Sequence, residues 1–220
     1  MSNGVNIRFK IHNILYEIYK FNKIYSDSKI QKIINSCSER DISFVNNVCL
    51  NTMRYHIYTL RIISKFVKKK PKINELLLLS SAITQIIYLD FKDYAVINSS
   101  VELAKKLNLY HGFINACLRK ILLEKDSLKK QKISFYDLPI WFTKNTNNLS
   151  NLEKNIFINS FYEEPNIHLV FKSKKLIDKF EEKIFKTSDI SGFLEKKVKI
   201  EKISSYNKGD WWVQDFSSFL

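Results

Sequence analysis

The stretch YHGFINACLRK, from Tyr110 to Lys120, constrains the fold of this 220-residue chain more than any other. Its apolar residues recur at helical spacing, with Ile114 and Leu118 on one line. Asn115 and Arg119 stand one helical turn apart, so they share a face of the same helix. The whole sequence has only 4 Gly and 3 Pro residues, which favours long helices with few tight turns. The stretch is therefore predicted to be one of several long helices.

Most of the first 130 residues carry the same helical periodicity. We predict helices at about residues 6–21, 28–36, 38–67, 74–89, 94–107 and 110–124. Ser38 and Asn74 are candidate N-caps for two of them. The helix at 74–89 is almost wholly apolar and is expected at the centre of the core, whereas the polar, Lys-rich residues 125–137 are expected to be a linker. Residues 1–130 are thus predicted to form an all-α domain.

After residue 137 the elements become shorter. Ser150 and Glu153 form a capping-box pattern that predicts a helix to about residue 162. Alternating apolar residues then predict strands, and one helical stretch lies between them. The predicted strands are at about 167–171, 197–203 and 211–213, and the predicted helix is at 174–185. Residues 137–220 are therefore expected to form a small α+β module, and the chain as a whole to be mainly α.

The chain has a formal net charge of +14, from 36 Lys or Arg and 22 Asp or Glu residues. Such an excess is typical of proteins that bind a polyanion, and RNA is the expected partner. Nothing indicates specific binding to DNA. A bias of the whole composition toward Lys would raise the charge equally well without a function.

The cysteines and the apolar segments indicate where in the cell the protein is expected. Cys37, Cys49 and Cys117 share no metal or redox spacing. The N-terminus has no apolar stretch of the secretory kind. The apolar run at 76–89 is too short, and too often interrupted by polar residues, to span a bilayer. A cytoplasmic protein without a membrane partner is expected.

Two segments resemble one protein family. The segment HGFINACLRKI at 111–121 is similar to the "GFVNAVLRRI" segment of NusB-type helical domains, in the version found at the head of bacterial 16S rRNA cytosine-C5 methyltransferases. The segment GDWWVQDFSS at 209–218 resembles the "vQD" segment just before the methyl-donor-binding domain of those enzymes. The resemblance implies a NusB-like RNA-binding domain at 1–130 and the enzymes' adjoining small domain at 137–220. Trp141 would be a packing anchor between them.

The resemblance, together with the charge, points to the residues that would meet RNA. They are basic or polar residues of the predicted helical domain, namely Arg8, Lys10, Arg54, Lys105, Lys106, Asn115, Arg119 and Lys120. In the family, the segment that holds Gln214 and Asp215 lies beside the methyl-donor domain. These two residues would therefore help to seat that domain.

Cytosine-C5 methylation needs a thiolate nucleophile and S-adenosylmethionine. The family carries both in a separate domain, whose Asp-x-Cys-Ala-Ala-Pro-Gly-Gly-Lys and Pro-Cys segments do not occur in this sequence. Cys117 fills an aliphatic position of the matching segment and is predicted to be a core residue. The sequence offers no catalytic residues, and its four His residues have no metal-ligand spacing. The chain itself is expected to need no cofactor, since S-adenosylmethionine would bind the absent domain.

Three functions stay open. The first is the RNA-binding part of a 16S rRNA cytosine-C5 methyltransferase, inactive alone, which positions rRNA for a methyltransferase domain outside this chain. The second is a free-standing NusB-like transcription antitermination factor that acts with a ribosomal protein. The third is a helical protein-interaction module. Trp211 or Trp212 could stack on RNA bases, the other being a core residue.

Overall fold

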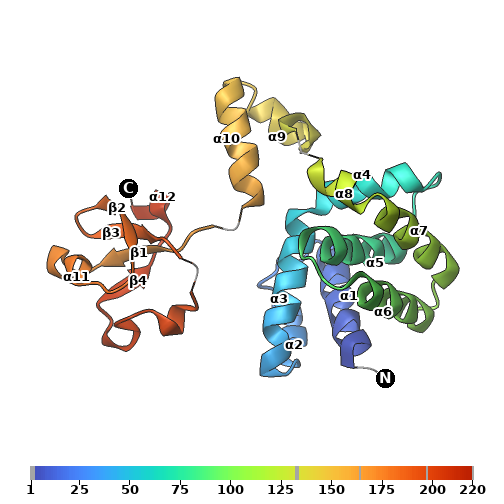
Figure 1. The fold of residues 1–220 in the computed structure, drawn as a ribbon, viewed down its shortest axis with the longest axis horizontal. Coiled ribbons are helices and arrows are strands. Elements are labelled where there is room, and N and C mark those ends of the chain that lie inside the picture. Colours follow the sequence, from blue (N-terminus) through green and yellow to red (C-terminus); the bar gives the residue numbers. More distant parts are fainter. Residues whose placement is uncertain (1–2, 132–133, 164, 197, 220) are drawn as a thin grey trace. The chain divides into compact units, whose positions relative to one another are not determined.

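The computed structural model describes residues 3–131, 134–163, 165–196 and 198–219. Its chain divides into two compact units: unit 1, residues 1–162, and unit 2, residues 163–220. Unit 1 is helical, and unit 2 contains a four-stranded antiparallel sheet (Figure 1). The predicted fold class, an all-α domain followed by a small α+β module, is confirmed.

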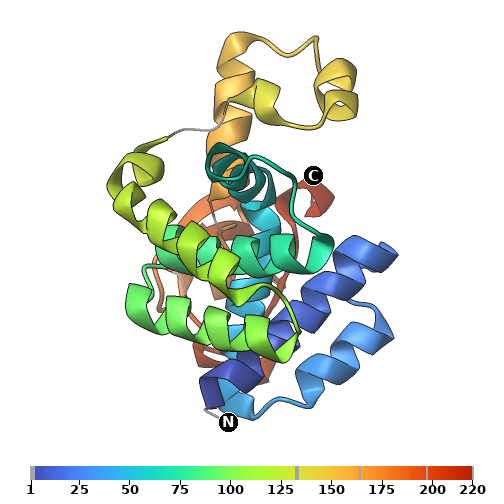
Figure 2. The ribbon, with the colours of Figure 1, turned by 90° about the vertical axis from the view of Figure 1, so that its right-hand side faces the viewer.

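Unit 1 is organised around α5 (Ile73–Ile83). Every residue of this helix from Leu76 to Ile83 is buried, and it packs against α1, α3, α4, α6 and α7. This confirms the predicted central helix. Figure 2 shows the helices that surround it. They are α1 (Asn3–Phe21), α2 (Ser28–Asn35), α3 (Glu39–Arg54), α4 (His56–Phe66), α6 (Asp93–Lys106), α7 (His111–Leu123) and α8 (Lys125–Lys130).

The two predicted N-caps have different outcomes. Ser38 is the N-cap of α3, and its hydroxyl oxygen accepts a hydrogen bond from the Asp41 N–H at 3.3 Å. Asn74 is not a cap, because α5 is capped at Lys72. The side-chain oxygen of Asn74 instead lies 3.3 Å from His12 Nε2, so it ties α1 to α5. That partner is far away in the sequence and leaves no local signal.

The helix predicted at 38–67 is interrupted at Tyr55, which separates α3 from α4. The Tyr55 ring stacks on the Tyr88 ring, with centroids 3.9 Å apart and planes 4° from parallel. Its hydroxyl donates to the backbone oxygen of Tyr162 at 3.4 Å. Aromatic stacking against two distant residues is a tertiary effect, so the periodicity alone could not reveal this break.

The helix predicted at 74–89 changes its geometry halfway. After Ile83 it continues as the π turn η1 (Thr84–Tyr88). The Leu89 N–H donates to the Thr84 oxygen, five residues back, at 3.1 Å. Such turns are rare and are absent from propensity rules.

The predicted linker at 125–137 begins with a helix instead, α8, whose Leu128 is buried. Three further elements follow within unit 1. They are η2 (Phe135–Asp137), α9 (Ile140–Asn145) and α10 (Asn151–Tyr162). Phe135, Leu138 and Ile158 pack with Tyr58 of α4 in one cluster. The compact second unit therefore starts at Glu163, whereas the second domain was expected from residue 137.

One of the two predictions for this segment is tested directly. The capping box is confirmed: the Ser150 N–H donates to Glu153 Oε2 at 2.7 Å, and the Glu153 N–H donates to Ser150 Oγ at 3.3 Å. Trp141 is 67% exposed on α9, and its role as a packing anchor between the two domains stays a prediction. Its neighbour Phe142 packs into the cluster instead, 5.9 Å from the ring centroid of Phe135.

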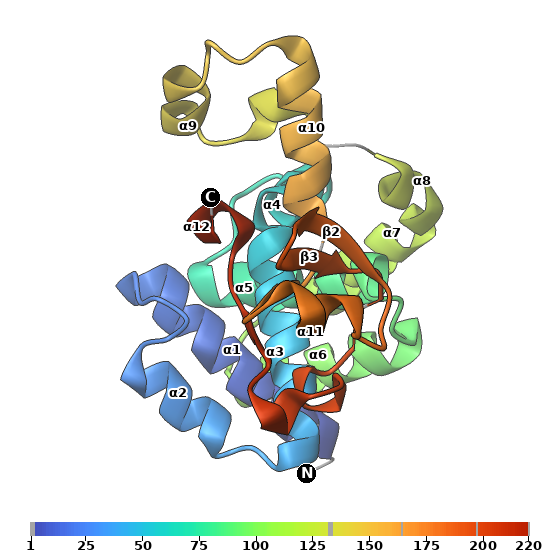
Figure 3. The same cartoon turned by 90° about the vertical axis from the view of Figure 1, so that its left-hand side faces the viewer.

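In unit 2 the strands lie in the order β2-β3-β1-β4, and all neighbours are antiparallel (Figure 3). The strands are β1 (His168–Phe171), β2 (Ile184–Ser188), β3 (Ser191–Leu194) and β4 (Trp211–Val213). The strands predicted at 167–171 and 211–213 are confirmed. The helix predicted at 174–185 ends early, as α11 (Lys174–Asp178), and β2 takes its last part.

The strand predicted at 197–203 is wrong from residue 198 onward, and residue 197 lies outside the described part. This segment holds the 3₁₀ turn η3 (Ile200–Lys202), followed by η4 (Tyr206–Lys208). The apolar residues that suggested a strand include Ile203, which enters the small core beside Leu169, Phe171 and Trp211. A turn that buries one apolar side chain thus produced a strand-like pattern.

Candidate nucleic-acid interface

The motif segment lies in a helical hairpin formed by α6 and α7. The two helices pack together, joined by a turn in which Asn108 has a φ of 53° and the Leu109 N–H donates to the Ala104 oxygen at 2.8 Å. At the other end of the hairpin, Lys125 Nζ lies 2.8 Å from the Asp93 carboxylate. The apolar faces of both helices are buried, so their charged residues face outward.

Lys105 and Lys106 end α6 beside the hairpin turn. Lys105 Nζ lies 2.8 Å from Glu102 Oε1, in an exposed ion pair that contributes little to stability. Lys106 Nζ lies 3.8 Å from the ring centroid of Phe9, a cation–π contact that ties α6 to α1. Both lysines cluster near the negative end of the α6 dipole.

Asn115, Arg119 and Lys120 continue the charged surface along α7. Arg119 Nε donates to Asn115 Oδ1 at 3.1 Å, so the predicted pair does share a face, and the pair orients the guanidinium group. Lys120 is exposed. From the helix rise of 1.5 Å per residue, Arg119 lies about 12 Å along α7 from its first residue, His111. The basic residues are therefore distributed along the length of the hairpin.

Cys117 lies on the inner side of α7 and is 4% exposed. Burial raises the pKa of its thiol to about 11. The thiol is therefore protonated at neutral pH and is not a nucleophile. This confirms Cys117 as a core residue.

Arg8 and Lys10, on α1, are engaged inside unit 1. Arg8 Nε donates to Gln85 Oε1 at 3.0 Å, and Arg8 Nη1 donates to the Gly4 oxygen at 3.2 Å. Burial lowers the pKa of the Arg8 guanidinium group. Lys10 Nζ donates to the Ser36 oxygen at 2.6 Å, at the end of α2. Both cations therefore hold parts of unit 1 together.

Arg54 is the last residue of α3 and so belongs to neither helix of the α6–α7 hairpin. Its Nη1 donates to Asn51 Oδ1 at 2.8 Å, and the residue is half-buried. The eight predicted RNA-binding residues are thus spread over four helices, α1, α3, α6 and α7. Five of them belong to the α6–α7 hairpin: Lys105, Lys106, Asn115, Arg119 and Lys120.

The loop between α4 and α5 adds a second basic surface that the resemblance did not single out. Lys68, Lys69 and Lys70 are exposed there, and Lys65 Nζ donates to Gln131 Oε1 at 2.8 Å. The signal was visible in the sequence, as a run of lysines before Pro71. We name residues 65–72 the lysine loop.

Gln214 and Asp215 are engaged within unit 2. The Gln214 amide accepts from Trp212 Nε1 at 2.9 Å and donates to the Ser218 oxygen at 3.0 Å. Asp215 accepts from the hydroxyl and the N–H of Ser217, and these hydrogen bonds lower the pKa of its carboxyl group. Both residues thus shape the terminal helix α12 (Phe216–Phe219).

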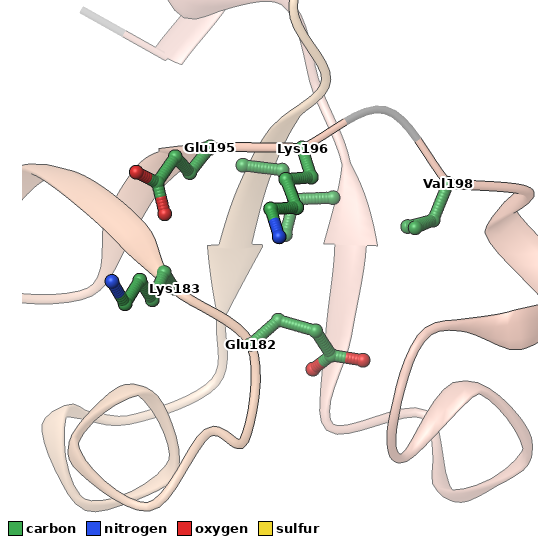
Figure 4. Close-up of a pocket in the computed structure, with 6 residues that line it drawn as sticks. Glu182, Lys183, Glu195, Lys196 and Val198 are labelled. Atoms are coloured by element: carbon green, nitrogen blue, oxygen red, sulfur yellow. The ribbon is translucent and has the colours of Figure 1, made fainter.

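A cavity of about 340 Å³ lies at one end of the sheet of unit 2 (Figure 4). It is lined by Glu182, Lys183, Leu194, Glu195, Lys196 and Val198. Two carboxylates and two ammonium groups give it no net preference for phosphate. The Glu182 carboxylate already accepts from the N–H and the hydroxyl of Ser204, at 2.7 and 2.6 Å. The cavity is therefore not a candidate RNA site.

Among the described residues, no group of three or more His, Cys, Asp or Glu side chains is placed to hold a metal ion. Over the same residues, the structure contains no helix with the length and apolarity required to cross a membrane.

Comparison with known proteins adds two findings. Residues 6–123 match the model of the NusB family. Among solved structures, the crystal structure of PH0851 is similar, with a TM-score of 0.49 and 14% sequence identity. The match covers 99% of this chain and 54% of that chain, so this chain spans about half of its length. No curated protein matches the sequence.

Proposed function

The chain belongs to the NusB family, and from this premise we propose that it binds RNA through unit 1. The contact surface comprises the outer side of the α6–α7 hairpin and the lysine loop. Arg119 and Lys120 are its principal cations on α7, and Lys105 and Lys106 extend it to the hairpin turn. Arg8 and Lys10 support the helices beneath it.

The distribution of charge carries this proposal. Residues 1–162 contain 25 Lys or Arg and 12 Asp or Glu residues, whereas residues 163–220 contain 11 and 10. Basic residues are about as frequent in both parts of the chain, so the difference in net charge arises because acidic residues are sparse in residues 1–162. Since the excess is confined to the unit that matches the family, it indicates a partner for that unit. Contacts between Lys or Arg and phosphate supply most of the sequence-independent affinity for nucleic acid.

The RNA we propose is 16S rRNA, positioned for cytosine-C5 methylation by a domain outside this chain. The support is the pair of segments at 111–121 and 209–218, which resemble those enzymes in the same order along the chain. Gln214 and Asp215 would help to seat that domain, and S-adenosylmethionine would bind there. The sheet-containing unit 2 favours this role over that of a free-standing antitermination factor.

The test is binding of the full chain to fragments of 16S rRNA, measured by fluorescence anisotropy at 50 and 200 mM salt. We expect affinity to fall steeply with salt, because neutralised phosphates release counterions. Arg119→Glu with Lys120→Glu should weaken binding about tenfold or more and flatten the salt dependence. Absence of binding at 50 mM salt would refute the proposal.

The matched control reverses two exposed lysines elsewhere in unit 1, Lys20→Glu and Lys144→Glu. It changes the net charge by the same amount. If it weakens binding as much as the α7 variant does, the hairpin has no special role. Selective binding of one short leader RNA, dependent on a ribosomal protein, would instead support antitermination.

A further inference from the structure

The sheet of unit 2 has the connectivity β1–α11–β2–β3–β4, with the strand order β2-β3-β1-β4. This is the split βαβ arrangement, in which the second helix is replaced here by the turns η3 and η4. The α11 residue Ile177 packs with Leu169 and Phe171 of β1, so it covers one face of the sheet. Four-stranded sheets of this kind bind single-stranded RNA where aromatic side chains stand on the opposite face.

The opposite face here carries a row of aromatic rings. His168 of β1 pairs with Phe193 of β3, and Phe193 pairs with Phe185 of β2. Directly paired residues point to the same face, and the ring centroids of His168 and Phe193 are 4.8 Å apart. Trp212 of β4 pairs with Val170, which stands two residues after His168 and so on the same face.

On this face the rings of the two outer strands are exposed to solvent, whereas the central residue His168 is buried. Phe185 is 63% exposed and Trp212 is 44% exposed, although both belong to strands. His168 between them is 3% exposed. Phe216 and Phe219 of α12 cover it, with ring centroids 5.2 and 5.8 Å from the imidazole. With neighbouring strands about 4.8 Å apart, the two open rings are about 14 Å apart across the sheet.

The Trp212 ring is also held in place. Its Nε1 donates to Gln214 Oε1 at 2.9 Å, and the Gln214 amide is fixed in turn by the Ser218 oxygen at 3.0 Å. A ring fixed in this way loses little conformational entropy when a flat partner stacks on it.

We propose that unit 2 binds unpaired RNA bases by stacking them on Phe185 and Trp212. This rests on the proposed RNA-binding function and adds a second contact to it, one for bases and not for phosphates. The near balance of charge in residues 163–220 fits this division, because stacking needs no net charge. Stable protein interfaces bury about 1,200–2,000 Å² of surface, whereas here two separate rings flank a middle that α12 already covers.

The experiment compares two RNAs of equal length and charge, a hairpin with an unpaired loop and a fully paired duplex. Binding of the full chain is measured for Phe185→Ala, Trp212→Ala and the double variant. The control is Trp141→Ala, which removes an exposed tryptophan from unit 1. Stacking contributes about 1–3 kcal/mol per base. Removal of either ring should therefore weaken binding to the loop RNA about tenfold. Duplex binding should not change, and Trp212→Phe should retain most of the affinity.

The outcomes separate the two proposals. If the unmodified chain binds neither RNA, the proposed function itself fails. If it binds both, and the double variant matches Trp141→Ala on the loop RNA, base stacking by unit 2 is overturned while RNA binding stands. Circular dichroism checks that each variant is folded. A second measurement uses the Trp141→Phe chain: loop RNA should quench the fluorescence of Trp212, and absence of quenching also overturns the proposal.

Discussion

Unit 1 and unit 2 differ in their charge and in the elements that carry their exposed aromatic rings. Unit 1 has about twice as many basic as acidic residues, and its exposed rings, such as Tyr94 and Trp141, lie on helices. Unit 2 balances its charges and exposes Phe185 and Trp212 on its sheet. Phosphate contacts position a nucleic acid, whereas base contacts specify it. The comparison therefore indicates that one chain divides these two tasks between its units.

The two units also differ in the size of their cores. The α5 helix of unit 1 is buried along eight consecutive residues and lies between two large apolar clusters. The sheet of unit 2 has one cluster of six buried residues. Small cores stabilise weakly, so the two units should respond separately to mutation.

The largest expected effect tests that separation. Leu79→Ala removes a fully buried side chain from α5 and should destabilise unit 1 by about 3 kcal/mol, within the range for such cavities. Helix loss followed by circular dichroism in urea should shift to lower concentration. In a Trp141→Phe background the remaining tryptophans, Trp211 and Trp212, both lie in unit 2, so the midpoint of their fluorescence should not shift. A joint shift of both signals would show that the units unfold as one.

A smaller effect is expected for Arg8→Ala, which tests whether this cation supports the fold. The change leaves Gln85 Oε1 without its donor in a buried position, so unit 1 should lose about 2 kcal/mol. The measurement is urea unfolding followed by circular dichroism. Lys10→Ala, on the same helix but with an exposed ammonium group, is the control and should cost less. Unchanged stability of Arg8→Ala would leave Arg8 free for RNA.

Mild acid should lower the stability of unit 1, because two of its histidines have lowered pKa values. Burial lowers the pKa of His12 and lowers that of His56 to about 4. The unfolded chain takes up these protons near pH 6.5, while the folded chain does not. Stability of unit 1 is therefore lost as the pH falls from about 7 toward 4. Since His56 is only partly buried, we expect about 1 kcal/mol from it at pH 5 after allowance for solvent.

Thermal unfolding at pH 7 and pH 5 measures this loss, and His56→Gln is the control. That variant should lose less stability between the two pH values than the unmodified chain does. Equal losses would mean that His56 does not set the acid response of unit 1.

The smallest effect is expected for Trp141→Ala. The ring lies on the surface of α9, and substitutions at exposed positions usually change stability by less than about 0.5 kcal/mol. Phe142→Ala, at the neighbouring packed position, should cost more. The measurement compares the urea midpoints of unfolding of Trp141→Ala and Phe142→Ala. If Trp141→Ala cost as much as Phe142→Ala, the exposed tryptophan would be an anchor after all.

Local signals account for what the sequence predicted well. Periodicity located the buried α5, and short-range hydrogen bonding located the caps at Ser38 and Ser150. The Asn115–Arg119 pair also followed from helical spacing alone. In each case the deciding partner lies within four residues or on the same helix face, where sequence rules apply.

What the sequence did not reveal has a different cause. The hydrogen bond of Arg8 to Gln85, for example, joins residues that are 77 positions apart. The strand β2 was taken for part of a helix because Ile184 continues the apolar spacing of α11, while Phe185 on the same strand faces solvent. The family resemblance assigned Trp141 a packing position, although the residue is 67% exposed on α9. Long-range packing decided all three, and one sequence does not display it.

The π turn η1 sets the angular phase of the residues that follow it. A π turn takes up one more residue than an α-turn does between hydrogen-bonded groups, and one residue corresponds to about 100° of rotation around a helix axis. If the segment kept its five residues but were regularly α-helical, each residue would turn farther around the helix axis, and Tyr88 would be rotated away from the Tyr55 ring that it now faces. The geometry of this turn therefore aligns the joint between α3 and α4 with the end of α10.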